Sequence, residues 1–390
     1  MTYDFDQVID RHETSAIKIE KMNEIWGRED LIPLWVADMD FATPPFVLDA
    51  VRHRCEHPIL GYTAKPESYF CAVADWVNRR YAMGVDRHHI NYVPGIVAGL
   101  GMAINCFSKE GDGVMIMPPA YTPFSWLTTR NRRRLVECPL RESDGRYRMD
   151  LELIRSRAKE AKLLILCNPH NPGGVVWQHE ELEELARICA EAGVLVLSDE
   201  IHADLTLPPH RHLPFACVSD LARQNSVTFM APSKTFNMPG MTASQAIIFN
   251  DDLRSRFEAH LEAGEFNMGH VFAFDSVAAA YNHGEEWLAQ CLDYIQANIE
   301  FVDDYLSRHT PLIRAMRPEA SFLVWLDCRA MGLSHDDLIR FFVDEAHLAI
   351  NDGETFGKEG AGFMRLNVAT PRSILRQAME QLGAAYAKRF

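Results

Sequence analysis

Short apolar runs alternate with amphipathic stretches from about residue 85 to about residue 250. Continuous apolar runs such as Leu163–Cys167 and Val194–Leu197 are typical of strands that are buried on both faces of a sheet. The stretch between these two runs has apolar residues at helical spacing, and we expect a helix over residues 179–192 that ends at Gly193. This alternation predicts an α/β domain with a mostly parallel central sheet.

Other apolar runs extend the same series. Val114–Met117 precedes a pair of prolines that would end a strand, and Val227–Met230 and Ala246–Phe249 have the same length and composition. A further helix is expected after Gly95 and continues to about Cys106. The predicted sheet therefore draws its strands from most of the first two thirds of the chain.

The pattern changes after about residue 285. A long helical stretch is followed by strand-like runs at residues 322–326 and 363–367, with a helical stretch at 336–345 between them and a last helix from about Pro371. These elements predict a smaller α+β domain.

No change of composition marks the boundary between the two parts. We predict a large α/β domain over residues 46–286 and a smaller domain built from residues 1–45 and 287–390. The alternative for the first 45 residues is that they cross to a partner subunit.

Composition and charge narrow the range of partners. The chain has 390 residues, of which 47% are apolar, which is enough for a large core. Its 54 acidic and 39 basic residues give a net charge of −15, so binding to nucleic acid phosphates is not expected. The basic run at residues 130–134 is expected to be a solvated helix end.

The nine cysteines are scattered, odd in number and without a C-x-x-C pair, which favours a reducing compartment. The first residues lack the apolar core of a secretion signal, and no apolar stretch of about 18 residues could span a membrane. We therefore expect a cytoplasmic protein without membrane contact, and we assign no metal site.

Three polar residues follow three different predicted strands. Asn168 comes directly after one strand, Asp199 closely follows the next, and Lys234 lies in a small-residue turn after a third. Because sites in open α/β sheets lie at the carboxyl ends of the strands, these side chains are expected to meet at one edge. Singly, they have simpler explanations: a turn residue, a helix cap and a surface lysine.

Together, a lysine and an acid at one edge indicate pyridoxal 5′-phosphate chemistry. This cofactor needs a lysine that bonds to its aldehyde and an acid that keeps its ring nitrogen protonated. The flanks of Lys234 are small and uncharged, which favours the partial burial that makes a lysine reactive near neutral pH. Asn168 and His202 are candidates for the phenolic oxygen of the cofactor, although His202 alone is equally expected as a structural histidine.

Further candidates surround this edge. The Gly95–Val97 turn opens a helix whose backbone N–H groups are expected to bind a phosphate, and Ser233 is a second donor. Tyr121 is a candidate for stacking on the cofactor ring, or else a core tyrosine. Arg365 stands in an apolar strand and is expected to bind a substrate carboxylate through two hydrogen bonds.

These residues resemble the pattern of the fold-type I pyridoxal phosphate enzymes of the class I/II aminotransferase superfamily. The resemblance spans nearly the whole chain and rests on the Asn-Pro-x-Asn-Pro-x-Gly motif from Asn168, together with Asp199, Ser233-Lys234 and Arg365. It implies the fold-type I architecture, with a mostly parallel central sheet and a smaller α+β domain.

Within this superfamily the chain is similar to the MalY/PatB-type C–S lyases, or cystathionine β-lyases. Three segments carry the narrower resemblance: Pro33–Phe41, Ser198–His202 and Ser233–Asn237. Two positions depart from the wider aminotransferase pattern. Thr242 stands where many members have a phosphate-binding arginine, and Ala231 where a serine is frequent. The threonine favours a lyase over an aminotransferase.

The resemblance implies a role for each candidate. Lys234 would bond to the cofactor, Asp199 would contact its ring nitrogen, and Tyr121 would stack on the ring. The other implied cofactor contacts are Asn168, His202, Gly95, Ile96, Val97, Ser233 and, from the neighbouring subunit of a homodimer, Tyr62. The implied substrate contacts are Arg365, Ala37 and Asn168.

The predicted reaction is β-elimination from L-cystathionine or a related cysteine S-conjugate, which yields pyruvate, ammonia and a thiol. Lys234, Tyr121 or Tyr62 would protonate the leaving thiol, and the sequence leaves this choice open. One alternative is an aminotransferase for an L-amino acid. Another is a regulatory protein that carries the cofactor and acts by binding another protein.

Overall fold

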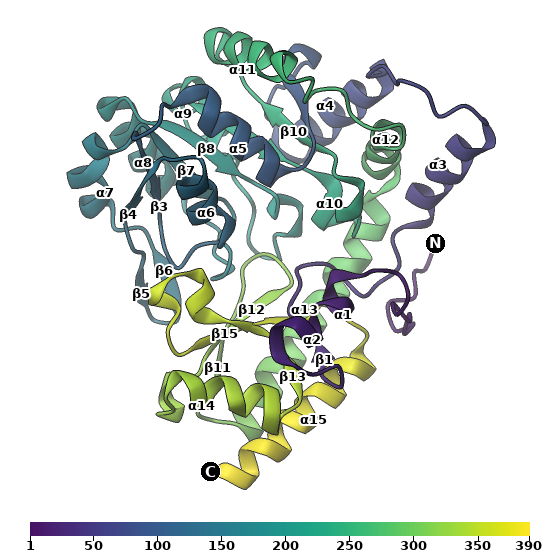
Figure 1. Cartoon of the computed structure of the whole chain (residues 1–390), viewed down its shortest axis with the longest axis vertical. Coiled ribbons are helices and arrows are strands. Elements are labelled where there is room, and N and C mark those ends of the chain that lie inside the picture. Colours follow the sequence, from purple (N-terminus) through teal and green to yellow (C-terminus); the bar gives the residue numbers. More distant parts are fainter.

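The computed structural model describes residues 1–390, and a seven-stranded sheet lies at the centre of its larger part (Figure 1). The strand order is β2-β10-β9-β8-β7-β3-β4. Strand β10 runs antiparallel to both of its neighbours, and the other neighbouring pairs are parallel. The prediction of a mostly parallel sheet is confirmed. Its strands are β2 (Ile90–Val93), β3 (Gly113–Ile116), β4 (Arg134–Glu137), β7 (Leu163–Cys167), β8 (Leu195–Asp199), β9 (Ser226–Met230) and β10 (Ser244–Ile247).

Helices cover both faces of this sheet, which explains why its strands are apolar at successive positions. Leu163 and Ile165 pack on one face, where they join the cluster that includes α5, α6 and α11. Leu164 and Leu166 point to the opposite face and pack with residues of α7, α8 and α9. These helices are α5 (Ile96–Phe107), α6 (Pro123–Arg130), α7 (Leu151–Arg157), α8 (His179–Ala192), α9 (Asp220–Gln224) and α11 (Asp251–Ala263).

A second sheet of four antiparallel strands, in the order β11-β12-β15-β14, lies in the C-terminal part. The predicted helix over 336–345 is an α-helix that continues as a π-helix, η7. The elements of this part are α13 (Glu285–His309), β11 (Arg314–Met316), β12 (Leu323–Asp327), α14 (His335–Arg340), η7 (Phe341–Glu345), β13 (Leu348–Ala349), β14 (Asn351–Asp352), β15 (Phe363–Asn367) and α15 (Arg372–Arg389).

The N-terminal segment lies against this C-terminal part. Strand β1 (Ile32–Pro33) pairs in parallel with β13, and Figure 1 shows α1 and α2 beside the second sheet. Within one chain the N-terminal segment thus contacts the C-terminal part, and the division into domains remains a prediction. The remaining elements are α1 (Ile17–Glu20), α2 (Met22–Trp26), α3 (Pro45–Glu56), α4 (Glu67–Tyr81), β5 (Arg141–Ser143), β6 (Arg146–Arg148), α10 (Pro232–Thr235) and α12 (Ala273–His283).

Short 3-10 turns connect many of these elements. Their bounds are η1 (Arg87–His89), η2 (Ala158–Glu160), η3 (Ala203–Leu205), η4 (Phe215–Cys217), η5 (Pro239–Met241), η6 (Arg329–Met331), η8 (Gly353–Phe356) and η9 (Lys358–Gly360). None of the helices is both long and apolar enough to cross a membrane.

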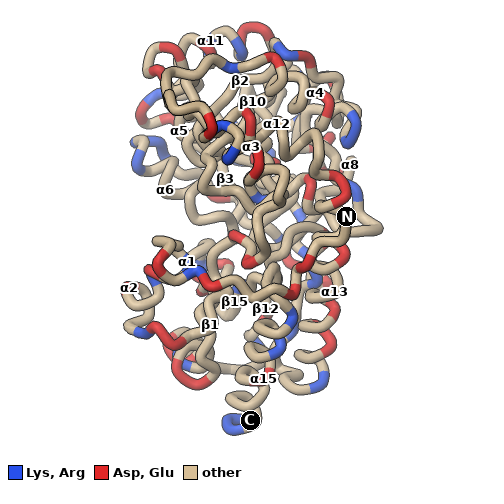
Figure 2. The backbone as a smooth tube through the Cα atoms, turned by 90° about the vertical axis from the view of Figure 1, so that its right-hand side faces the viewer, with Lys and Arg blue, Asp and Glu red and all other residues tan.

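The predicted solvated helix end at residues 130–134 is wrong for Arg133. Its guanidinium is buried and donates to the hydroxyl and carbonyl oxygens of Ser108 and to the side chain of Asn105. Elsewhere, acidic and basic positions are interspersed along the side of the molecule shown in Figure 2.

Candidate active site

The carboxyl edge of the central sheet contains a cavity of about 420 Å³. Asp199 is the last residue of β8, and Lys234 lies on α10, which follows β9. The cavity brings together most of the residues that the sequence predicted. Those that line it are Ala37, Gly95, Ile96, Val97, Tyr121, Asp199, His202, Ser233 and Lys234.

The amine of Lys234 lies inside this cavity and donates a hydrogen bond to the backbone carbonyl of Ala37. Burial lowers the pKa of Lys234 to about 8. The negative charge of Asp38 acts against this shift, whereas the positive charge of Arg365 adds to it. A larger fraction of the amine is therefore neutral near pH 7 than in an exposed lysine, and the neutral amine is the form that attacks a carbonyl or accepts a proton.

Asp199 presents a buried carboxylate to the cavity. Its side chain accepts one hydrogen bond, from the backbone N–H of Ile201 at 3.1 Å. Burial, together with a smaller effect of the charge of Glu200, raises the pKa of Asp199 to about 7. Because the chain gives this buried carboxylate only one hydrogen bond, a ligand that brings an N–H or a positive charge would stabilise its ionised form. A protonated ring nitrogen is such a group.

His202 and Tyr121 supply ring nitrogens and a hydroxyl group to the same cavity. Burial lowers the pKa of His202 to about 3, and the charges of Lys234 and Arg365 act in the same direction. The ring is therefore neutral, and its buried Nδ1 has no hydrogen-bond partner in the chain. Burial also raises the pKa of Tyr121, which keeps its hydroxyl protonated near neutral pH.

The cavity contains Asn171 and not Asn168. The amide of Asn168 is turned away and donates to the carbonyl of Leu213 at 3.0 Å. Asn171, the second asparagine of the same motif, receives a hydrogen bond from Arg365 at 3.1 Å. The motif predicted a segment that does border the cavity. Which of its two asparagines lines the cavity depends on the direction of the side chains. The repeat of Asn-Pro within the motif was the available signal.

Arg365 of β15 lies beside the cavity, fully enclosed by polar and aromatic groups. It also donates to the side chain of Asn351 at 2.6 Å and to the carbonyl of Trp35 at 3.2 Å. Its guanidinium lies over the ring of Phe356, and its buried Nε has no partner. Burial lowers the pKa of Arg365 to about 10, so the group stays cationic at neutral pH.

The segment at the start of α5, from Pro94 to Ala98, also lines the cavity. Gly95 caps this helix with φ +101°, a conformation that residues with a side chain rarely adopt. The first turn of α5 and Ser233 therefore form a site suited to an anion. Thr242 lines the same cavity. It is the residue that stands where many aminotransferases have a phosphate-binding arginine.

Tyr62 does not reach this cavity within one chain. It lies in the loop between α3 and α4 and is fully exposed, as are large parts of its neighbours Ile59 and Leu60. The loop forms part of a separate surface hollow with residues 265–271.

The residues that line the cavity include a suitable partner for each polar group of pyridoxal phosphate. The cavity offers Asp199 for a ring nitrogen, Lys234 for an aldehyde, unpartnered His202 for a phenolic oxygen, and helix N–H groups for a phosphate. The residues present therefore fit the cofactor that the sequence predicted.

Comparisons with known proteins agree with this site. The model of the family described as aminotransferase class I and II matches residues 29–382. The chain is 39% identical to cystathionine beta-lyase PatB of Bacillus subtilis over 98% of its own length and 99% of that protein.

Two solved structures are similar over almost the whole chain. A PLP-bound putative aminotransferase from Clostridium difficile has a TM-score of 0.97 at 36% identity and covers 99% of this chain and 100% of its own. Cystalysin from Treponema denticola, which contains pyridoxal 5′-phosphate, has a TM-score of 0.95 at 33% identity, with 100% of both chains covered. The chain belongs to the aminotransferase class I and II family.

Proposed function

We propose that the protein is a pyridoxal phosphate-dependent C–S β-lyase that acts on L-cystathionine or related cysteine S-conjugates. The observation that carries the proposal is the partly neutral amine of Lys234, which shares one cavity with the buried carboxylate of Asp199 and lies close to the cation of Arg365. The similarity to a relative named as a cystathionine beta-lyase supports this choice of reaction.

Specific residues would hold the cofactor. Asp199 would bind its ring nitrogen, Tyr121 would lie against the ring, and the Gly95–Val97 turn with Ser233 would bind the phosphate. The free Nδ1 of His202 and the amide of Asn171 are the groups best placed for the phenolic oxygen, so Asn171 replaces Asn168 in this role. When bound, the cofactor supplies an electron-accepting ring that lowers the cost of removing a proton from the substrate Cα.

The side chains of the protein would divide the remaining work. Arg365 holds the substrate carboxylate, which orients the Cα–H bond. The neutral amine of Lys234 takes the Cα proton, the Cβ–S bond breaks, and its electron pair leaves with the sulfur. The thiolate accepts a proton from Lys234 or Tyr121, and the three-carbon remainder reacts with water to give pyruvate and ammonium.

We further propose that the functional unit is a homodimer in which Tyr62 reaches the cofactor phosphate of the partner. A fully exposed tyrosine beside exposed Ile59 and Leu60 is unusual for a surface loop and favours burial against another subunit.

We also propose a reducing, cytoplasmic location, which the nine unpaired cysteines support.

The direct test is incubation of the purified holoenzyme with L-cystathionine in the absence of any 2-oxo acid. A lyase releases pyruvate and free thiol in equal amounts over many turnovers. An aminotransferase stops after one turnover without a 2-oxo acid and resumes when one is added, and that result would contradict the lyase proposal.

A further inference from the structure

Residues 35–41 form an irregular segment whose backbone is held mainly by side chains around the active site. The carbonyl of Trp35 accepts from Arg365, and that of Ala37 accepts from Lys234. The amide of Asn367 donates to the carbonyls of Val36 and Asp38 at 2.6 and 2.7 Å. The segment thus contacts both the proposed carboxylate anchor and the catalytic lysine.

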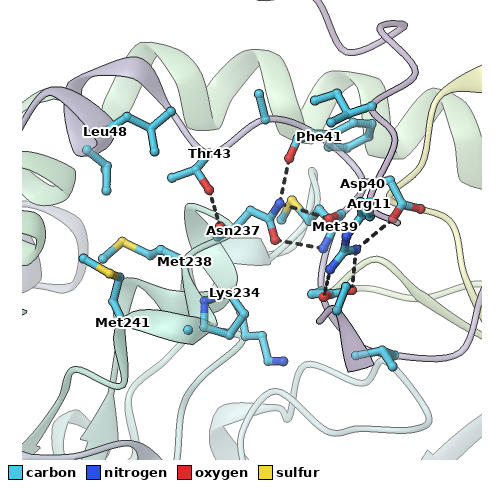
Figure 3. A pocket seen from close by; sticks show the side chains of 18 of the residues that line it. Arg11, Met39, Asp40, Phe41, Thr43, Leu48, Lys234, Asn237, Met238 and Met241 are labelled. Carbon is cyan, nitrogen blue, oxygen red and sulfur yellow. Dashed lines mark hydrogen bonds and ion pairs between the residues drawn. The ribbon is translucent and has the colours of Figure 1, made fainter. Parts of the chain in front are cut away.

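A cluster of four charged side chains lies at the same segment. Arg11 donates to both carboxylate oxygens of Asp38, at 2.6 and 3.2 Å, and to Asp40 at 3.1 Å. Lys18 donates to both oxygens of Asp40 at 2.9 Å, and its side chain is 0% exposed. Figure 3 shows Arg11 beside Asp40 in a hollow of about 680 Å³ that Lys234 also lines.

The four charged side chains of this cluster come from two separate stretches of the chain. Both cations come from residues 11–18, and both anions come from residues 38–40, on either side of Met39. Removing a lysine from water costs several kcal/mol, and an ion pair recovers this cost only with near-ideal geometry. Such a cluster adds little to stability, but it fixes one relative position of the two stretches that carry it.

We propose that Arg11, Lys18, Asp38 and Asp40 are positioning residues for the amine of Lys234. The cluster connects the N-terminal stretch to the side chain of Asp38. Ala37 directly precedes Asp38, and its backbone carbonyl accepts the hydrogen bond from Lys234. The inference rests on the proposed function only in that Lys234 moves the Cα proton of an amino acid.

The physical reason is the sensitivity of proton transfer to distance. A shift of about 1 Å in a catalytic group can lower a rate on the order of 100-fold. Without the cluster, Asp38 and Asp40 would lose their contacts to the N-terminal stretch. The Ala37 peptide would then depend on Asn367, which binds the carbonyls of Val36 and Asp38, and on Asn237, which binds the backbone at Met39 and Phe41. The amine would then sample more positions.

The test compares Arg11→Met and Lys18→Met with the conservative Arg11→Lys and with Lys21→Met as a control. Lys21 is exposed and pairs only with Glu24, so the control removes a nearby cation without touching the cluster. Two quantities are measured on the holoenzyme. One is hydrogen exchange of the backbone amides in residues 35–41, and the other is exchange of the Cα hydrogen of L-alanine with deuterated water.

We expect both methionine variants to exchange the amides of residues 35–41 faster and the Cα hydrogen roughly 10- to 100-fold more slowly. Arg11→Lys, which keeps the charge, should recover part of the Cα rate, and Lys21→Met should match the wild type. Arg11→Lys is the mildest change and keeps the test valid if a methionine variant fails to fold.

Two results would overturn the inference: amide exchange in residues 35–41 that stays unchanged, or a Cα rate in Arg11→Met within about 3-fold of the control. L-alanine has no leaving group at Cβ, so this readout does not depend on the lyase step. A wild-type enzyme that exchanges the Cα hydrogen but releases no thiol from cystathionine would contradict the proposed function and leave the positioning role intact.

Discussion

Asp199 combines an unfavourable environment with an essential proposed role. In the cofactor-free protein its pKa is raised to about 7 by burial, whereas an unfolded chain ionises it near 3.8. The folded state therefore binds more protons between these pH values, and its stability falls as the pH rises from about 4 to 7. Above pH 7 the full cost of the buried charge is present.

Asp199→Asn should remove this cost. We expect the cofactor-free variant to be more stable than the wild type at pH 8, by roughly 2–4 kcal/mol, and to lose this advantage as the pH falls towards 4. Turnover should fall at least about 100-fold, because the ring nitrogen of the cofactor would lose the charged partner proposed for it. Thermal unfolding at several pH values measures the first effect, and a constant difference in stability would contradict the assignment.

Lys234 allows a second test at the residue scale. The aldehyde of the cofactor reacts with a neutral amine, and the pKa of Lys234 is lowered to about 8 by burial. The rate at which the cofactor-free protein recombines with pyridoxal phosphate should therefore rise with pH and level off above about 8. Stopped-flow absorbance measures this rate, and a midpoint near the ordinary lysine value of 10.5 would contradict the buried position.

At the scale of single residues, the sequence predicted residue types better than side-chain directions. Lys234, Asp199 and His202 line the cavity as predicted, and each stands at the end of a strand or within four residues after it. Asn168 follows β7 directly, yet its side chain turns to Leu213, and Asn171 takes the place expected for it. The backbone path of the turn after β7 determines which asparagine lines the cavity, and the apolar periodicity of the sequence does not predict this path.

At the scale of elements, periodicity predicted buried strands and amphipathic helices well. Strand β7 and helix α8 have the bounds that the apolar pattern indicated, and Gly193 ends α8 with φ +68°. Strand β10 was shifted, since it begins at Ser244 and includes the buried Gln245. Backbone pairing with β2 and β9 sets its limits, and apolarity does not.

The start of α5 offers a test with a matched control. Gly95 and Gly193 both have a positive φ and free space around an added Cβ, but only Gly95 lines the cavity. Alanine at either position should cost about 1–2 kcal/mol of stability. Only Gly95→Ala should also weaken binding of pyridoxal phosphate, by about 10-fold, because it shifts the N–H groups proposed to bind the phosphate.

Equilibrium titration of each cofactor-free variant measures this affinity. Equal losses in Gly95→Ala and Gly193→Ala would show that the change in affinity reflects stability alone. That outcome would place the phosphate elsewhere in the cavity.

At the scale of the whole molecule, the amphipathic pattern indicated two parts. The two larger sheets of the structure differ in kind: one is mixed and mostly parallel, and the other is antiparallel. The position of Tyr62 is the feature that one chain cannot explain. The sequence identified it through a resemblance and not through chemistry, and in the structure it is fully exposed.

Mixing two inactive variants tests the proposed dimer. Tyr62→Ala lacks the proposed contact to the partner, and Lys234→Ala lacks the reactive amine. A mixed dimer contains one site with a native Lys234 and a native Tyr62 from the opposite subunit. After unfolding and joint refolding of equal amounts, activity should return to about a quarter of the wild-type value, as random pairing in a two-fold dimer predicts. No gain over the separate variants would contradict a shared site.

The central claim is that the substrate nitrogen leaves as ammonium after the C–S bond breaks. The most direct measurement supplies the holoenzyme with L-cystathionine labelled with ¹⁵N at the amine of the cleaved cysteine half, together with an excess of 2-oxoglutarate, and follows the label by NMR. We predict that the label appears as ammonium in step with pyruvate. Appearance of the label in glutamate, with the C–S bond intact, would contradict the lyase account and establish an aminotransferase.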